Sequence, residues 1–397
     1  MRERKLWRKP RHQAVISLVQ PILRPFVRWK YHITMEPFPQ EGNRPYLILM
    51  NHQTGYDQFF VAMTFKKAVY YVATEDIFSL GFASDIIRFL VAPIPIRKQT
   101  TDIQAVKNCI RVAREGGSVC MAPEGNRTFH GRTVHINPAV GGLAKKMGLP
   151  IAFFRIEGGY GIQPRWSDVV RGGTMRSYVS RVMEPEEYQD LSNEELAEVI
   201  CRELWVDEAR DLGEYPHPRN AEFLERLIYT CPSCGLAPFE SNGDILRCSR
   251  CGAKIRHKAN KELEGIGFRF PHRYVADWLD WQNSFVNTLD PRAMSAQPVF
   301  TDRARFSMVH LYRNKKKLIN NACVRLFGDK IRVDDREFTF DDLSAVTILG
   351  KNKINLYYGK ETFQLKGDSR FNAVKYVNFY HRYKNHKAGN ANEFLGI

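Results

Sequence analysis

Two polar segments, each directly after a short apolar run, constrain the fold of this chain more than any other feature. The run 45–50 leads into the first segment, 51–57, and the run 118–122 leads into the second, 123–127. Apolar runs of this length, bounded by polar segments, are typical of buried strands. Such strands favour a parallel sheet, in which the working groups lie in loops at the carboxyl ends of the strands.

The chain around these segments alternates between strand-like and helix-like patterns. Residues 67–74 and 150–156 are predicted as further strands, and residues 103–114 and 139–147 as helices. This alternation predicts an α/β fold with a mostly parallel, mixed sheet that helices cover on both faces.

His52 and Asp57, in the first polar segment, have side chains that suit general-base chemistry. Imidazole titrates near neutral pH, so His52 is the candidate base, and Asp57 could accept the other ring N–H and stabilise the imidazolium. Positions five apart on a regular helix point about 140° away from each other. The pairing therefore requires His52 to lie at the entrance of a helix. The alternative is that His52 only caps that helix.

Two arginines and a glutamate are candidate substrate ligands. Guanidinium groups bind phosphate through paired hydrogen bonds, which makes Arg97 and Arg127 candidate phosphate ligands. Glu124, which Gly125 follows, would hold a hydroxyl group or position an arginine. The alternatives are that Arg97 is a surface charge after a strand and that Glu124 and Arg127 form a local ion pair.

These motifs resemble those of the phospholipid acyltransferase family, which acylates glycerol phosphate and lysophosphatidic acid. The resemblance covers roughly residues 35–212. Thr54 stands where the family usually has serine, Asn126 stands where it has threonine, and the glycine of its arginine block is missing. The residues that match are Asn51, His52, Asp57, Arg97, Pro123, Glu124, Gly125, Arg127 and the apolar block Leu149-Pro150-Ile151.

The resemblance implies transfer of an acyl chain from acyl-CoA or acyl carrier protein to a hydroxyl of a glycerol-phosphate lipid acceptor, in phospholipid biosynthesis. The default acceptor is 1-acylglycerol-3-phosphate, with glycerol 3-phosphate, another lysolipid or a glycolipid as alternatives. No catalytic cofactor is required. Catalysis would fall to His52 and Asp57. The substrate-binding residues would be Arg97, Glu124, Gly125 and Arg127.

The net charge of +16 is concentrated at the two ends of the chain. Residues 1–35 hold nine Lys/Arg against one acidic residue, and residues 301–397 hold 19 Lys/Arg against 10 Asp/Glu. The rest of the chain is close to neutral. Basic ends suit an anionic membrane surface or nucleic acid, whereas solubility alone would not need this segregation.

The N-terminal segment 1–34 is basic and partly apolar. Its apolar stretch 14–27 is interrupted by Pro21, Arg24 and Pro25, so it falls short of the roughly 20 apolar residues that span a bilayer. It also lacks the small-residue cleavage site of a signal peptide. We expect a helix that lies in the headgroup region or packs on its own domain. The first reading places the protein at the cytoplasmic face of the membrane, peripheral or monotopic.

Four cysteines in two pairs predict a metal site within residues 225–260. Cys231 and Cys234 form the first pair, and Cys248 and Cys251 form the second. Four thiolates at this spacing suit a tetrahedral, structural zinc ion, as in a zinc ribbon, because they leave no open position on the metal. Two disulfides are the alternative.

The C-terminal part has short strand-like runs separated by tight turns, followed by an aromatic-rich helix. Residues 322–387 resemble a PH-like or GRAM-like β domain, with a connecting helical or irregular segment at 261–321 and a tail at 388–397. An alternative for the whole chain is a non-enzymatic, nucleic-acid-binding protein built around the zinc ribbon. It leaves the segments around His52 and Glu124 without a role, so nucleic acid is not the expected partner.

Overall fold

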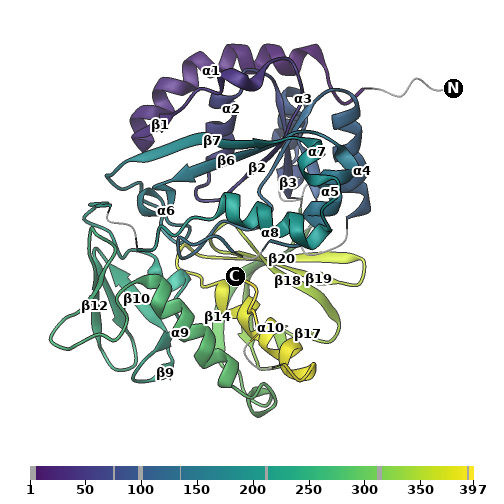
Figure 1. The fold of residues 1–397 in the computed structure, drawn as a ribbon. Helices are drawn as coiled ribbons and strands as arrows, with labels where there is room; N and C mark the ends of the chain where they lie inside the picture. Colours follow the sequence, from purple (N-terminus) through teal and green to yellow (C-terminus); the bar gives the residue numbers. More distant parts are fainter. Residues whose placement is uncertain are drawn as a thin grey trace. The chain divides into compact units, whose positions relative to one another are not determined.

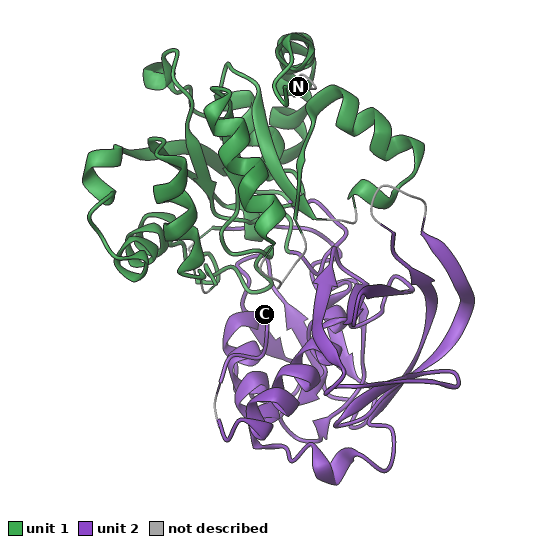
Figure 2. Cartoon of the chain, turned by 90° about the vertical axis from the view of Figure 1, so that its right-hand side faces the viewer, with its two compact units in different colours: residues 1–164, 172–213 green, residues 165–171, 214–397 purple. Residues whose placement is uncertain are grey.

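The chain folds into two compact units (Figure 2). Unit 1 comprises residues 1–164 and 172–213, and unit 2 comprises residues 165–171 and 214–397. The structure is a computed structural model. It describes residues 6–74, 77–96, 102–134, 136–210, 213–310, 315–390 and 393–397.

Unit 1 contains a seven-stranded sheet with the strand order β1-β7-β6-β2-β5-β3-β4 (Figure 1). Neighbouring strands are parallel except β6 and β7, which are antiparallel. The prediction of a mostly parallel, mixed sheet is therefore confirmed. The strands are β1 (Ile33–Met35), β2 (Leu47–Met50), β3 (Val69–Thr74), β4 (Ile94–Ile96), β5 (Ser118–Met121), β6 (Ile151–Glu157) and β7 (Met175–Met183).

Helices cover both faces of this sheet (Figure 1). On one face, α4, α5 and α8 pack over a core that contains Leu47, Val119 and Phe153. On the other face, the segment that ends α2 brings Phe65 against Phe154 of β6. The helices are α1 (Pro10–Tyr31), α2 (Asp57–Thr64), α3 (Phe82–Val91), α4 (Ile103–Arg114), α5 (Ala139–Met147), α6 (Gly159–Ile162), α7 (Pro185–Tyr188) and α8 (Asn193–Leu204), with 3-10 turns η1 (Pro39–Glu41) and η2 (Ile77–Ser79).

The central strand β2 explains how the sheet positions the first polar segment. Its four residues are all buried, as expected for a strand covered on both faces. It lies between β5 and β6 and is parallel to both. The carboxyl ends of β2 and β5 therefore meet at one edge of the sheet, where Asn51 and Ala122 continue the chain.

Unit 2 begins with small antiparallel elements around the four cysteines. Strands β8 and β9 form a two-stranded ladder, and β10 to β13 form a four-stranded antiparallel sheet in sequence order. The elements are η3 (Leu224–Arg226), β8 (Thr230–Cys231), β9 (Gly235–Leu236), β10 (Phe239–Asn242), β11 (Ile245–Cys248), β12 (Lys254–His257), β13 (Leu263–Gly265), α9 (Val275–Thr288) and η4 (Arg292–Met294).

The C-terminal part of unit 2 is a seven-stranded antiparallel sheet followed by one helix, α10. The strand order is β17-β16-β15-β14-β20-β19-β18. Its likeness to PH or GRAM domains stays a prediction. The elements are β14 (Phe300–Met308), β15 (Lys316–Leu326), β16 (Lys330–Val333), β17 (Arg336–Thr339), β18 (Leu343–Leu349), β19 (Lys353–Tyr358), β20 (Glu361–Gly367) and α10 (Val374–Lys387).

This sheet begins earlier in the chain than the sequence indicated. The segment 261–321, expected to be helical or irregular, contains β13, α9, all of β14 and the first half of β15. The β domain therefore starts at Phe300 and not near residue 322. Two register shifts in the ladder between β14 and β15 disturb the period-two pattern by which a strand is recognised in sequence.

In the part of the chain that the structure describes, no helix combines the length and the apolar character needed to cross a bilayer.

Candidate active site

The two polar segments come together at the carboxyl edge of the sheet in unit 1. Asn51 and His52 follow β2 directly, and Pro123 and Glu124 follow β5 after one residue. The two strands are adjacent and parallel, with Leu49 opposite Met121. Loops far apart in the sequence therefore meet at one place, as expected for a parallel sheet.

His52 and Asp57 are in direct contact. The Nδ1 atom of His52 lies 2.8 Å from Oδ2 of Asp57. Helix α2 begins at Asp57, so His52 lies before the helix, as the pairing of two residues five apart requires. Asp57 is fully buried, whereas 27% of the His52 side chain is exposed. A carboxylate can only accept, so Nδ1 donates, and the lone pair of the neutral ring lies on Nε2.

The carboxylate of Asp57 also folds the loop that carries His52. The backbone N–H of Gln53 donates to Oδ2 over 2.7 Å, and the backbone N–H of Thr54 donates to Oδ1 over 2.9 Å. The hydroxyl of Thr54 donates to Oδ1 over 2.6 Å, so threonine can fill the position where serine was expected. Asp57 thus stabilises both the orientation of the imidazole and the path of the backbone around it.

Glu124 anchors the backbone of the His52 loop. Its Oε1 atom accepts from the N–H of His52 over 2.8 Å, and its Oε2 atom accepts from the N–H of Val134 over 3.2 Å. In the opposite direction, the carbonyl of His52 accepts from the N–H of Thr128 over 3.0 Å. The sequence suggested that Glu124 holds a hydroxyl group or an arginine. That role stays a prediction; in the structure both carboxyl oxygens of Glu124 accept from backbone amides.

Burial raises the pKa of the Glu124 carboxyl to about 8, against the opposing effect of the two amides that donate to it. The Glu124 carboxyl therefore binds its proton more tightly in the folded chain than in the unfolded chain. Its contribution to stability is therefore complete below the unfolded pKa of 4.5 and is lost as the pH rises through about 8.

This linkage predicts the behaviour of Glu124→Gln. The glutamine cannot ionise, so the variant escapes the loss of stability that the wild type suffers between pH 4.5 and about 8. Relative to the wild type, its melting temperature should rise steadily across this window. Thermal unfolding of both proteins at a series of pH values measures the difference. A difference that stays constant with pH would contradict the assignment.

Gly125 and Arg127 have different roles in the second segment. The N–H of Gly125 donates to the carbonyl of Ala122 over 3.1 Å and closes a β-turn, with Gly125 at a φ of 68°. A Cβ there would meet no atom within 4 Å, so glycine serves the backbone conformation. Arg127 is half-buried and lies beside Gly55 of the His52 loop. A Cβ atom added to Gly55 would be 3.2 Å from Nη1 of Arg127. Burial lowers the pKa of Arg127 to about 10, which leaves it cationic at neutral pH.

Arg97, the other candidate phosphate ligand, lies outside the described residues. The described chain reaches Ile96, the last residue of strand β4, and resumes at Asp102.

Two buried polar residues fix the backbone near the site; in the sequence Asn51 is part of the matching motif without a role, and Glu208 is not singled out. The side chain of Asn51 donates to the carbonyl of Ile156 and accepts from its N–H, both over 2.8 Å, and so joins the ends of β2 and β6. Glu208 accepts from the N–H groups of Gly158 and Tyr160 over 2.7 and 2.8 Å. For Asn51 the sequence does offer a signal, because it is a polar residue that directly follows a buried strand. Glu208 gives no local signal, because its partners lie about 50 residues away.

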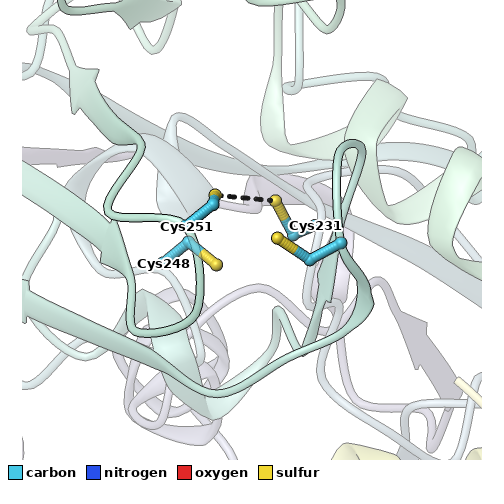
Figure 3. Close-up of side chains that lie close together, drawn as sticks. Cys231, Cys248 and Cys251 are labelled. Atoms are coloured by element: carbon cyan, nitrogen blue, oxygen red, sulfur yellow. Dashed lines mark hydrogen bonds between the residues drawn. The ribbon is translucent and has the colours of Figure 1, made fainter.

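The four cysteines of unit 2 lie close together. Their Sγ atoms are all within 4.8 Å of one another, and those of Cys231 and Cys251 are 3.8 Å apart (Figure 3). A tetrahedron with Zn–S bonds of about 2.3 Å has sulfur atoms about 3.8 Å apart, so the cluster fits this ion. Gly235 and Gly252, at φ values of 71° and 76°, turn the chain back after each pair.

Residues 30–156 match the family model described as Acyltransferase. No curated protein gives a match to the chain. Among solved structures, the 1-acyl-sn-glycerophosphate (LPA) acyltransferase PlsC from Thermotoga maritima is similar. The identity is 18%, the alignment covers 48% of this chain and 77% of that chain, and the TM-score is 0.41. The range matched by the family model contains His52, Asp57, Glu124 and Arg127.

Proposed function

We propose that this protein is a glycerolipid acyltransferase that uses His52 as its general base. The observation that carries the proposal is the contact between His52 and Asp57, held beside the Glu124 loop at the carboxyl edge of a parallel sheet. The match of residues 30–156 to the Acyltransferase family model supports the same reaction class. The acyltransferase domain extends over residues 35–212 in this proposal.

The reaction follows from the arrangement of the two side chains. Nε2 of His52 takes the proton from a hydroxyl of the acceptor, and Asp57 stabilises the imidazolium through Nδ1–H. The hydroxyl oxygen forms a bond to the carbonyl carbon of an acyl thioester, on CoA or acyl carrier protein. The C–S bond then breaks, and the imidazolium returns its proton to the leaving thiolate. Backbone amides near the start of α2 would stabilise the oxyanion. No cofactor takes part in these steps.

The proposed acceptor is a phosphate-bearing glycerol lipid, with 1-acylglycerol-3-phosphate as the default in phospholipid biosynthesis. Arg127 supports this choice because its guanidinium group lies at the His52 loop and remains charged at neutral pH. Arg97 is the second proposed phosphate ligand, and Gly125 shapes the loop that carries Arg127.

An acceptor screen tests this function directly. Purified protein is given an acyl-CoA or an acyl carrier protein thioester together with 1-acylglycerol-3-phosphate, glycerol 3-phosphate, a zwitterionic lysolipid or a glycolipid. We expect thioester consumption that depends on the acceptor and is fastest with 1-acylglycerol-3-phosphate. Equal rates with acceptors that lack a terminal phosphate would reject the proposed acceptor class. No transfer to any acceptor would reject the reaction.

A variant of Arg127 separates phosphate binding from chemistry. Arg127→Ala should raise the KM for 1-acylglycerol-3-phosphate by about tenfold to a hundredfold, because a hydrogen bond to a charged group contributes about 1.5–3 kcal/mol. Its kcat should change little. Arg127→Lys keeps the charge and should recover part of the affinity. A fall in kcat at unchanged KM would contradict phosphate recognition by this residue.

We further propose that Cys231, Cys234, Cys248 and Cys251 hold a structural zinc ion within a zinc ribbon at residues 225–260. The distances among their Sγ atoms support this assignment. Four sulfur ligands would complete the coordination of the metal, so its contribution is to the stability of this part of unit 2. We also propose that the C-terminal antiparallel sheet, together with α10, is a PH-like or GRAM-like module.

A further inference from the structure

Three cationic side chains lie in one row across the C-terminal sheet of unit 2. Lys366 of β20 is directly opposite Arg305 of β14 on one side and directly opposite Lys353 of β19 on the other (Figure 1). Residues that are opposite each other on neighbouring strands point to the same face, with Cβ atoms about 5 Å apart. The row therefore gathers three positive charges over about 10 Å.

This cationic row lies on the outer face of its sheet. Arg305 and Lys366 are exposed, and Lys353 is half-buried. Among the residues that the structure describes, Arg305 and Lys366 have no acidic side chain within ion-pair distance. The adjacent positions along the three strands point to the opposite face and are buried there: Phe306, Leu365 and Ile354.

The cationic row is unfavourable for the sheet itself. Like charges directly opposite each other on neighbouring strands are destabilising. Solubility would be served equally well by lysines dispersed over the surface, without this repulsion. A bound anion would remove the repulsion, so the row indicates a ligand.

A hollow of about 420 Å³ opens beside the row, and Lys366 belongs to both. Its size is within the range of small-molecule sites, about 300–1,000 Å³. The charged side chains of its lining are Arg226, Lys351 and Lys366 against Asp168 and Asp368. The lining is therefore cationic on balance, like the row.

The carboxylate of Asp168 is used within the wall of the hollow. It accepts from the guanidinium group of Arg226 over 2.7 and 2.9 Å, and from Nζ of Lys351 over 2.6 Å. These contacts hold two of the cations in place and leave the ammonium group of Lys366 without a competing carboxylate.

A second set of contacts fixes the rim. The side-chain amide of Asn352 donates to the carbonyl of Gly367 over 3.1 Å and to that of Asp368 over 2.6 Å. In return, the N–H of Gly367 donates to the carbonyl of Asn352 over 3.1 Å. The turn between β18 and β19 is thus tied to the segment after β20, and the hollow is formed before a ligand arrives.

We propose that the cationic row and the hollow form a binding site for a ligand that carries two or more phosphate groups. Ammonium and guanidinium groups bind phosphate oxygens through charge-assisted hydrogen bonds. Cations one strand apart suit neighbouring phosphate groups, whereas a single phosphate group would reach only one step of the row. The inference goes beyond acyl transfer and does not depend on it.

The test is calorimetric titration of the full-length protein with inorganic tripolyphosphate, and with inorganic phosphate for comparison. We expect one saturable site that binds tripolyphosphate at least about tenfold more tightly than phosphate. Lys366→Ala and Arg305→Ala should each weaken tripolyphosphate binding by about tenfold or more, because each removes a charged hydrogen bond. Zinc content after the titration verifies that the probe has not removed the metal.

The matched control is Lys254→Ala. Lys254 is an exposed lysine of β12 that lies directly opposite Arg247 of β11, so it also has a cationic neighbour, but it is outside the row and the hollow. It should bind like the wild type. Equal weakening by Lys254→Ala and Lys366→Ala would show a general attraction to a basic protein and would overturn the site. Absence of saturable binding to the wild type would overturn it as well.

Thermal unfolding adds a readout that a merely structural lysine would not give. Without ligand, Lys366→Ala should melt at a higher temperature than the wild type, because the repulsion in the row is relieved. Tripolyphosphate should raise the melting temperature of the wild type and have a much smaller effect on the variant. A variant that is less stable than the wild type without ligand, and is stabilised as strongly by it, would assign Lys366 to the fold alone.

A further comparison identifies the source of the phosphate groups. The probes are phosphatidylcholine vesicles that contain a lipid with two phosphate monoesters on its headgroup, and the same headgroup free in solution. Tighter binding to the vesicles, lost in Lys366→Ala, would support the site with a lipid as its ligand. Equal or tighter binding of the free headgroup, also lost in the variant, would support it with a soluble ligand. No acyl donor or acceptor is present, so these outcomes are distinct from that of the acyl-transfer assay.

Discussion

Replacement of His52 by alanine is expected to abolish acyl transfer and to leave the fold of unit 1 unchanged. General-base catalysis contributes about 10²- to 10⁴-fold to a rate, and the variant has no group that could replace Nε2. Alanine keeps the backbone N–H that donates to Glu124 and the carbonyl that accepts from Thr128. The loop should therefore keep its path while the base is absent. Thioester consumption with 1-acylglycerol-3-phosphate as acceptor measures the loss.

Two further variants make this result specific. Asp57→Asn should also lower kcat strongly, because an amide stabilises the imidazolium less well and can favour the wrong tautomer. His386→Ala is the matched control: this histidine of α10 has 34% of its side chain exposed and lies 3.7 Å from Asp290. It should leave turnover unchanged. Full activity of His52→Ala, with an unchanged melting temperature, would remove the basis of the enzyme proposal.

Replacement of Cys248 by serine is expected to cause the largest loss of stability in unit 2. Cys248 is fully buried, and a serine hydroxyl is a far weaker zinc ligand than a thiolate. Binding of zinc to comparable four-ligand sites is worth about 10–16 kcal/mol in isolated peptides, so the folding of residues 225–260 should depend on it. We expect the variant to lose its zinc and to be cleaved by protease within this segment. Zinc content by mass spectrometry and the map of cleavage sites are the measurements.

Cys323→Ser is the control for this experiment. It makes the same substitution in β15, at a half-buried cysteine outside the four-cysteine cluster. It should bind one zinc ion per chain, as we expect of the wild type, and should resist protease. Unchanged zinc content in Cys248→Ser, or a wild-type chain purified without zinc and still resistant to protease, would contradict the structural metal.

The parts of the site that were predictable from sequence are local. His52 and Asp57 are five residues apart, and a loop that enters a helix is enough to bring them together. The parallel sheet followed from the alternation of apolar runs and helical patterns. The backbone contacts of Glu124 were not predictable, because its partners are the amides of His52 and Val134, and a backbone amide leaves no mark in a sequence.

The same distinction applies to unit 2. The two cysteine pairs are short local motifs, and the structure brings their sulfur atoms together. Strand β14 was missed because its ladder with β15 contains two register shifts, and the pairing is set by distant strands.

The backbone of His52 is held from both directions by the loop after β5, through its N–H and its carbonyl. Main-chain contacts and Asp57 thus help to fix the position of the imidazole. A substitution elsewhere in unit 1 that leaves these contacts in place should leave the ring of His52 where it is. An engineer could therefore exchange residues elsewhere at this edge of the sheet and still keep the imidazole in position.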